Sequence, residues 1–123
     1  MMDAKRYNSV EWFEVATDKP EEAKKFYGEL FGWTYASGQE YSEVTTPGAD
    51  QPTGGVFDSR GRFPGYAIFY VTVEDVPATL AKAESLGAKT LVPPTTTPDG
   101  LVFAQLQDST GNHFGVFSPH PEA

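Results

Sequence analysis

Apolar and polar positions follow two different periods along the first third of the chain. In residues 10–16, Val10, Trp12 and Glu14 alternate with Glu11, Phe13 and Val15, which is consistent with a strand near the core. Apolar residues then recur at spacings of three and four, which favours a helix with one apolar stripe. We expect Asp18 to cap this helix and Gly32 to end it. The stripe consists of Ala23, Phe26, Tyr27, Leu30 and Phe31.

The same pattern starts again in the second half of the chain. After the first helix, strand-like runs at residues 33–36, 40–46 and 53–57 lead to a turn-rich segment at 58–65, which we interpret as a linker. A strand is predicted at 66–73, then a helix opened by Asp75 and ended by Gly87. Its apolar positions are Val76, Leu80, Ala83 and Leu86. Further strands are expected at 89–92, 101–107 and 112–117, with Pro93-Pro94 bounding the first of these.

This repetition predicts a duplicated fold. Each half reads strand, helix, strand, strand, strand, so the class is α+β with two tandem βαβββ modules, at about residues 9–58 and 65–118 of a single domain spanning 1–123. A helix covers one sheet face in each half. The two free faces are then expected to curl into one cupped mixed sheet, with both helices on the convex side.

Charge and composition exclude several classes of function. The net charge of −8 argues against nucleic acid and anionic membranes as partners. The absence of cysteine excludes disulfides and thiolate sites. No P-loop or dinucleotide motif occurs, and we expect no cofactor. The first residues lack the apolar core of a signal peptide, so we predict a cytoplasmic location.

Several segments resemble a known family. The run WFEV before the first helix, FYGELFGW at its end, VEDVPATLAKAESLGAK and the closing DSTGNHFGVFSP resemble the vicinal oxygen chelate superfamily. That superfamily includes glyoxalase I, the bleomycin-resistance proteins and the extradiol dioxygenases. The resemblance covers about residues 9–119, and it implies the cupped fold and a homodimer. One such scaffold hosts many chemistries, so the resemblance specifies the fold better than the reaction.

The resemblance also implies where metal ligands would stand. Metal-dependent members use His and Glu from the first and last strands of each half. Here those positions fall on Trp12, Ile68 and Gly115, while the strand at 53–57 offers no ligating side chain. None of these side chains binds a divalent cation. We therefore predict that the usual metal site is absent.

Strand alternation predicts which side chains face the cup. They form an aromatic cavity with few polar groups, which is typical of a small-molecule site. Phe69, Val71 and Val73 are expected against the helices instead. The inward-facing set is Trp12 and Glu14 from the first strand, Tyr66, Ile68, Tyr70 and Thr72 from the fifth, and His113, Gly115 and Phe117 from the last, with Tyr41 and Gln105 as weaker candidates.

Two of these residues are candidate catalytic groups. A carboxylate among rings, as expected for Glu14, either finds a partner or has its pKa raised, and both outcomes suit acid–base chemistry or cation binding. The alternative is a glutamate at the sheet rim, bonded to arginine, backbone or water. His113 either faces the cup beside Gly115 or lies half-exposed at an edge. Trp12 either stacks on a ligand or fills the core.

Three hypotheses about function follow. The first is a metal-independent, bleomycin-resistance-like protein that binds a small molecule, with a cationic aromatic as the model ligand. The second is a lyase- or isomerase-type enzyme in which Glu14 or His113 acts as general base and Tyr66 or Tyr70 polarises an oxygen. The third is a structural or regulatory dimer without an open pocket, its cup filled by side chains such as Phe117.

Overall fold

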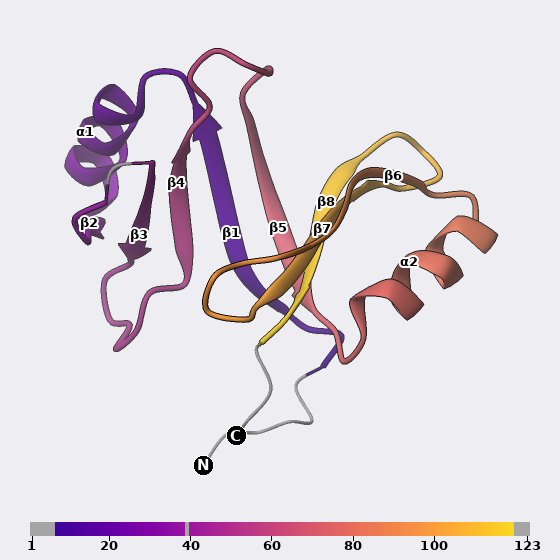
Figure 1. The fold of residues 1–123 in the computed structure, drawn as a ribbon. Coiled ribbons are helices and arrows are strands. Elements are labelled where there is room, and N and C mark those ends of the chain that lie inside the picture. Colours follow the sequence, from indigo (N-terminus) through magenta and orange to yellow (C-terminus); the bar gives the residue numbers. More distant parts are fainter. Residues whose placement is uncertain (1–6, 39, 120–123) are drawn as a thin grey trace. The chain divides into compact units, whose positions relative to one another are not determined.

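The repeated order of elements is present in the computed structural model, which describes residues 7–38 and 40–119 (Figure 1). Both the α+β class and the two βαβββ modules are confirmed. The first module contains β1 (Val10–Thr17), α1 (Pro20–Phe31), β2 (Thr34–Tyr35), β3 (Tyr41–Thr45) and β4 (Gly54–Asp58). The second contains β5 (Tyr66–Thr72), α2 (Val76–Ser85), β6 (Lys89–Thr96), β7 (Val102–Gln107) and β8 (His113–Ser118).

The chain divides into two compact units. The N-terminal unit is Trp12–Ile68, and the C-terminal unit comprises the described residues before and after it, 7–11 and 69–119. The boundary falls within β1 and β5. The cupped placement of the two halves and the single domain stay predictions.

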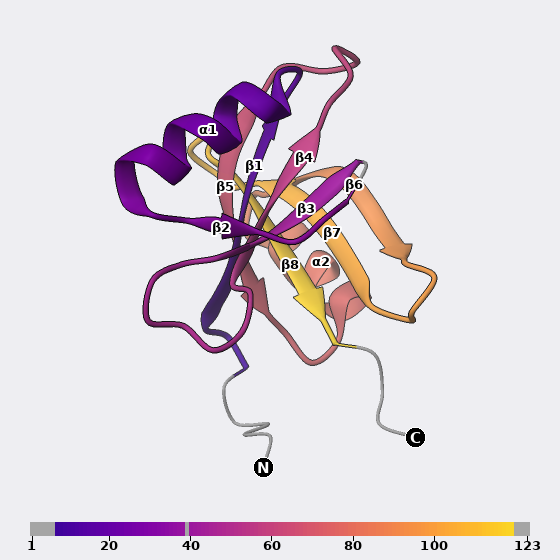
Figure 2. The ribbon, with the colours of Figure 1, turned by 90° about the vertical axis from the view of Figure 1, so that its left-hand side faces the viewer.

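The N-terminal unit holds a mixed sheet in the order β2-β3-β4-β1. β1 and β4 run parallel, with Glu14 opposite Gly55, and the other neighbours are antiparallel. α1 lies over one face of this sheet (Figures 1 and 2). On that face the ring of Phe13 occupies the space that a side chain at Gly54 would need. Because strand residues alternate, Trp12 and Glu14 lie on the opposite face.

The predicted start of α1 is wrong by one residue. Its N-cap is Lys19, whose side chain makes no capping bond, and Asp18 is not the cap. Pro20 at the first helical position disfavours a helical conformation in the residue before it, so Lys19 becomes the last non-helical residue. The hydroxyl oxygen of Thr17 accepts the Lys19 backbone N–H at 3.1 Å. Gly32 ends the helix as predicted, with a φ of 77°.

The apolar stripe of α1 is only partly covered. None of its residues is fully buried, and Phe26 and Leu30 are 58% and 59% exposed. The rings of Tyr27 and Phe31 instead pack on Trp33, with centroids at 4.9 and 5.7 Å. Trp33 in turn packs on Phe13 of β1 at 5.1 Å, so aromatic contacts link the helix to its sheet, while Phe26 and Leu30 are exposed.

The C-terminal unit repeats this arrangement with a better-covered helix. Its strand order is β5-β8-β7-β6, with β5 and β8 parallel and Tyr70 opposite Gly115. Asp75 caps α2 as predicted, accepting the Ala78 N–H at 2.9 Å. Gly87 follows the helix with a φ of 98°. The core between α2 and the sheet is Val73, Val76, Leu80, Ala104, Leu106 and Val116.

β6 is longer than predicted. It runs through Pro93 and Pro94, which we expected to bound it at residue 92. Prolines are tolerated there because β6 is the last strand in the order of this sheet and has register shifts between Thr90 and Thr95. Neither helix in the part of the chain that the structure describes has the length and apolar character to cross a membrane.

Candidate ligand site

A buried carboxylate with two tyrosine partners lies on the sheet face of the N-terminal unit that is opposite α1. Glu14 is 6% exposed. Its Oε1 accepts the Tyr41 hydroxyl at 2.9 Å, and its Oε2 accepts the Tyr66 hydroxyl at 2.5 Å. Trp12 donates its indole N–H to the Tyr41 oxygen at 2.9 Å. Glu14 has thus found partners within a preorganised network, and it does not lie at a solvated rim.

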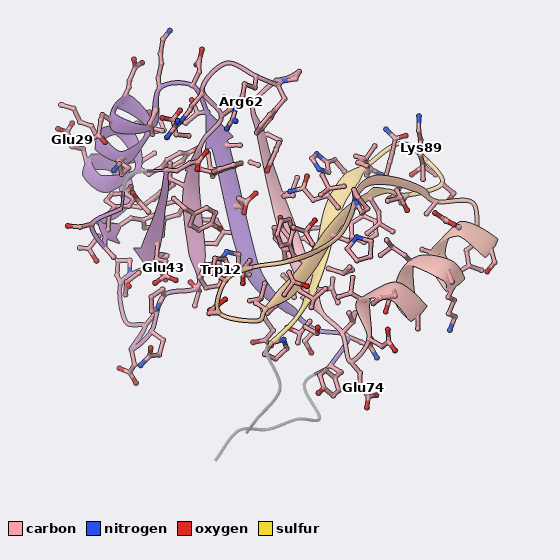
Figure 3. The ribbon with its side chains drawn as sticks, viewed as in Figure 1. Trp12, Glu29, Glu43, Arg62, Glu74 and Lys89 are labelled. Carbon is pink, nitrogen blue, oxygen red and sulfur yellow. The ribbon has the colours of Figure 1, made fainter. Side chains whose placement is uncertain are left out.

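A row of aromatic rings accompanies this network. Tyr41 packs on Phe57 at 5.9 Å, Phe57 on Phe63 at 5.9 Å, and Phe63 stacks on Tyr66 at 6.0 Å. Each of these rings is partly exposed, whereas the carboxylate that two of them bond is buried. Below, the ring set means Trp12, Tyr41, Phe57, Phe63 and Tyr66. Trp12 projects from β1 of this unit in Figure 3.

Gly55 makes room for this arrangement. It lies on β4 directly opposite Glu14, and a Cβ at this position would overlap the ring of Tyr41. The missing side chain lets the Tyr41 ring lie flat on the strand, so that its hydroxyl reaches Glu14. Tyr41, a weak candidate from the sequence, is therefore a central member of the network.

A second chain of hydrogen bonds lies in the C-terminal unit. Gln105 donates from Nε2 to the Tyr70 oxygen at 2.8 Å, and His113 Nε2 lies 2.8 Å from Gln105 Oε1. Tyr70 and Gln105 are buried, and His113 is partly buried. Burial lowers the pKa of His113 below its usual value of 6.5. Neutral imidazole is therefore the dominant form of His113 at neutral pH.

The hydrogen-bond network of Glu14 and the hydrogen-bonded series of Tyr70, Gln105 and His113 occupy equivalent positions in the two repeated modules. Glu14 and Tyr70 each lie opposite the glycine of a parallel neighbour strand, Gly55 or Gly115. The Tyr70 ring fills the space over Gly115, just as the Tyr41 ring does over Gly55. One unit thus presents a carboxylate where the other presents a phenol.

Three other residues that were predicted to face the cup lie on β5 and β8. Ile68 is buried on β5, and Phe117 packs edge-on against Tyr70 at 6.3 Å. Thr72 is 6% exposed, and its hydroxyl has no hydrogen-bond partner among the described residues. Of the two linker arginines, Arg62 donates to Glu40 at 3.0 Å, and Arg60 Nε lies 3.9 Å from the same carboxylate oxygen.

The residues in each unit do not fit the divalent metal that the fold family often carries. Trp12, Ile68 and Gly115 offer no ligand atom, and both oxygens of Glu14 already accept hydroxyl protons. Among residues 7–38 and 40–119, no group of three His, Cys, Asp or Glu side chains is placed to hold an ion.

A separate cleft of about 500 Å³ lies in the N-terminal unit. It is lined by Thr17, Asp18, Ser59 and residues 61–65, so it shares only Phe63 with the ring set.

Two members of the ring set, Phe57 and Phe63, were not predicted from the sequence. Phe63 lies in a turn-rich segment without strand periodicity, and a single aromatic among Gly, Pro and Arg residues is the only sequence signal there.

Comparison with known sequences identifies a family. The sequence model of the Glyoxalase/Bleomycin resistance protein/Dioxygenase superfamily matches residues 9–116. CFP32 of Mycobacterium tuberculosis, named as a glyoxylase, is 33% identical over 117 residues, covering 90% of this chain and 44% of CFP32. A glyoxylase-like domain-containing protein of Didymella fabae is 30% identical over 93 residues, covering 69% of this chain and 73% of that protein. The chain therefore spans less than half the length of CFP32.

Solved structures share the fold at low identity. Methylmalonyl-CoA epimerase from Mycobacterium tuberculosis has a TM-score of 0.65 at 11% identity, covering 98% of this chain and 94% of the epimerase. An Mn(II)-bound glyoxalase from Novosphingobium aromaticivorans has a TM-score of 0.65 at 17% identity, covering 96% of this chain and 42% of that one. At these identities the likeness concerns the fold alone.

Proposed function

We propose that this chain, which belongs to the glyoxalase/bleomycin resistance protein/dioxygenase superfamily, binds a small cationic aromatic molecule on the ring set around Glu14. The observation that carries the proposal is the buried carboxylate bonded by two partly exposed tyrosines. A cation over an aromatic face is attracted by the ring quadrupole. A negative charge behind the rings adds to that attraction.

This arrangement favours an organic cation over a metal ion. Both oxygens of Glu14 accept hydroxyl protons, so a ligand need not displace them to benefit from the charge. A diffuse charge such as a quaternary ammonium group loses little hydration when it meets aromatic faces. We therefore propose that binding is metal-independent, a view that the indole of Trp12 at an expected ligand position supports.

Tryptophan fluorescence tests this proposal. Trp12 belongs to the ring set, whereas Trp33 packs under α1, so the Trp33→Phe variant reports on Trp12 alone. We expect benzyltrimethylammonium to quench this emission at millimolar concentration or below, and neutral benzyl alcohol to do so at least about tenfold more weakly. Equal responses to both compounds would remove the cationic part of the proposal. No response to either up to 10 mM would overturn it.

An enzyme is the second candidate. His113 is neutral at pH 7, partly exposed and held by Gln105, which suits a general base. Glu14 is less suited, because both of its oxygens already accept hydrogen bonds. The name of CFP32 also keeps an enzymatic role in view. Loss of deuterium from a ketone labelled beside its carbonyl, measured with wild type and His113→Asn, would detect such a base.

Two further expectations are proposals as well. The resemblance to dimeric family members and the exposed Phe26 and Leu30 on α1 support pairing of two copies of the chain. Sedimentation equilibrium of wild type and Leu30→Lys measures this; a monomeric wild type would contradict it. The cytoplasmic location predicted from the sequence stays a proposal, which fractionation of the source cells would test.

A further inference from the structure

Three side chains of the C-terminal unit are linked by two hydrogen bonds. Which group donates in each bond determines which nitrogen of His113 carries the proton. His113 Nε2 faces Gln105 Oε1, and Gln105 Nε2 faces the Tyr70 oxygen, both at 2.8 Å. Gln105 is 7% exposed and Tyr70 is 5% exposed. Leaving a buried amide without its hydrogen-bond partners is unfavourable, so burial favours an arrangement in which the Gln105 amide keeps both bonds.

An amide oxygen only accepts and an amide nitrogen only donates. Because Oε1 faces the imidazole, Nε2 of His113 must carry a proton. Because the amide nitrogen donates to Tyr70, the hydroxyl proton of Tyr70 is directed to a group other than Gln105. If the amide were turned over, Tyr70 would donate to Gln105 and neutral His113 would carry its proton on Nδ1. The tautomer of His113 therefore shows which group donates in each of the two hydrogen bonds of Gln105.

We propose that Gln105 is a positioning residue that fixes neutral His113 with its proton on Nε2, which leaves Nδ1 as the nitrogen that gains a proton. In this direction, protonation of Nδ1 leaves the bond to Gln105 intact and strengthens it, because the donor becomes charged. In the reverse direction, a protonated His113 would set its N–H against the amide N–H. The observed direction thus allows the imidazole to change charge without losing its partner.

This behaviour is what a reversible general base requires. The ligand class is a molecule with an acidic hydroxyl, or with an acidic C–H beside a carbonyl. The X–H bond breaks, the proton passes to Nδ1, and the electron pair stays on the ligand as an oxyanion or enolate. That use rests on the second function proposed above, whereas the tautomer does not depend on any ligand.

Nitrogen-15 NMR of the imidazoles tests the inference directly. The chain has two histidines, so a His120→Asn variant assigns both signals. Above the pKa of His113 we expect Nε2 to give the signal of a protonated nitrogen and Nδ1 that of an unprotonated one, without the averaging of a tautomer mixture. A protonated Nδ1, or an averaged signal, would overturn the inference.

Variants at two glutamines separate positioning from general packing. Gln105→Leu removes the amide, and Gln51→Leu is the control, because Gln51 is an exposed glutamine of the N-terminal unit. We expect Gln105→Leu to speed exchange of the Nε2 proton with water about tenfold, the factor lost with one net hydrogen bond, and Gln51→Leu to leave it unchanged. Equal exchange rates in wild type and Gln105→Leu would contradict a positioning role.

Gln105→Glu is a second variant that tests the inference if Gln105→Leu does not fold. A carboxylate still accepts from Nε2, so the tautomer should persist while the His113 pKa rises; an unchanged or lower pKa would count against the assigned bond. Failure of the general-base role can be told apart from failure of the tautomer assignment. If NMR shows the expected tautomer but no deuterium loss depends on His113, the hydrogen bonds of Gln105 are established and their catalytic use is rejected.

Discussion

Tyr66 donates its hydroxyl to Oε2 of Glu14 at 2.5 Å, although 52 residues separate them in sequence. The bond joins β5 to β1 within the N-terminal unit. With Tyr41 on the other oxygen, it holds a carboxylate beneath aromatic rings rather than in solvent.

Replacing Glu14 by Gln should weaken both folding and cation binding. The amide keeps one neutral oxygen and replaces the other by an NH2 donor, so both tyrosine hydroxyls lose a charged acceptor and one loses its acceptor altogether. We expect a loss of about 1–3 kcal/mol in unfolding free energy. Binding of benzyltrimethylammonium should fall at least about tenfold. The matched control is Glu29→Gln, an exposed carboxylate on α1, which covers the other face of the sheet (Figure 3). If both variants lost the same affinity, net charge rather than position would explain binding.

Substituting Gly55 by Ala should displace Tyr41. The added Cβ overlaps the Tyr41 ring, which must move and so loses its bonds to Trp12 and Glu14. We expect a destabilisation of about 1–3 kcal/mol in urea unfolding. Gly28→Ala is the control, because its Cβ would meet only the Trp33 carbonyl at 3.4 Å and the side chain of Tyr35 at 3.7 Å. A fully stable Gly55→Ala would show that Tyr41 does not depend on this glycine.

Thr72→Val should stabilise the protein. The buried Thr72 hydroxyl has no partner among the described residues, and valine has nearly the same shape without a polar group to desolvate. We expect a gain of about 1 kcal/mol in unfolding free energy. Thr72→Ser, which keeps the hydroxyl and loses the methyl, should cost about 1 kcal/mol. A destabilised Thr72→Val would reveal a hydrogen-bond partner such as a buried water.

Acid should loosen the turn before β8 in a defined pH range. Asp108 accepts the backbone N–H groups of Asn112 and Thr110, and bonds chiefly from Asn112 lower the pKa of this exposed carboxyl from 3.8 to about 2. The native state therefore holds the ionised form more strongly than the unfolded state does. The stabilisation is complete above about pH 4 and is lost as pH falls toward 2. Carboxyl NMR titration measures this pKa.

A variant supplies the control for that pH range. Asp108→Asn keeps a carbonyl acceptor without a charge, so its turn should not respond to pH between 4 and 2. Amide hydrogen exchange of residues 108–112 reports this difference. An Asp108 pKa near 3.8 in the folded protein would contradict the assigned hydrogen bonds.

Local signals along the chain predicted the elements better than their contacts. Asp75 and Gly32 were identified because a cap and a left-handed stop depend on neighbouring residues alone. The prediction that Pro93 and Pro94 bound the strand was wrong, because only the sheet order shows that β6 lies at an edge. Alternation placed Glu14 with Trp12, but the bonds from Tyr41 and Tyr66 depend on strand register, which a single sequence does not give. Phe63 lies outside any periodic segment.

The central claim is that an organic cation sits on the ring set around Glu14. Intermolecular NOEs between the N-methyl protons of benzyltrimethylammonium and the protein test it most directly. We predict cross-peaks to ring protons of Trp12, Phe63 and Tyr66, and their loss in Glu14→Gln. Cross-peaks confined to other surfaces, such as Phe26 and Leu30 of α1, would contradict the claim.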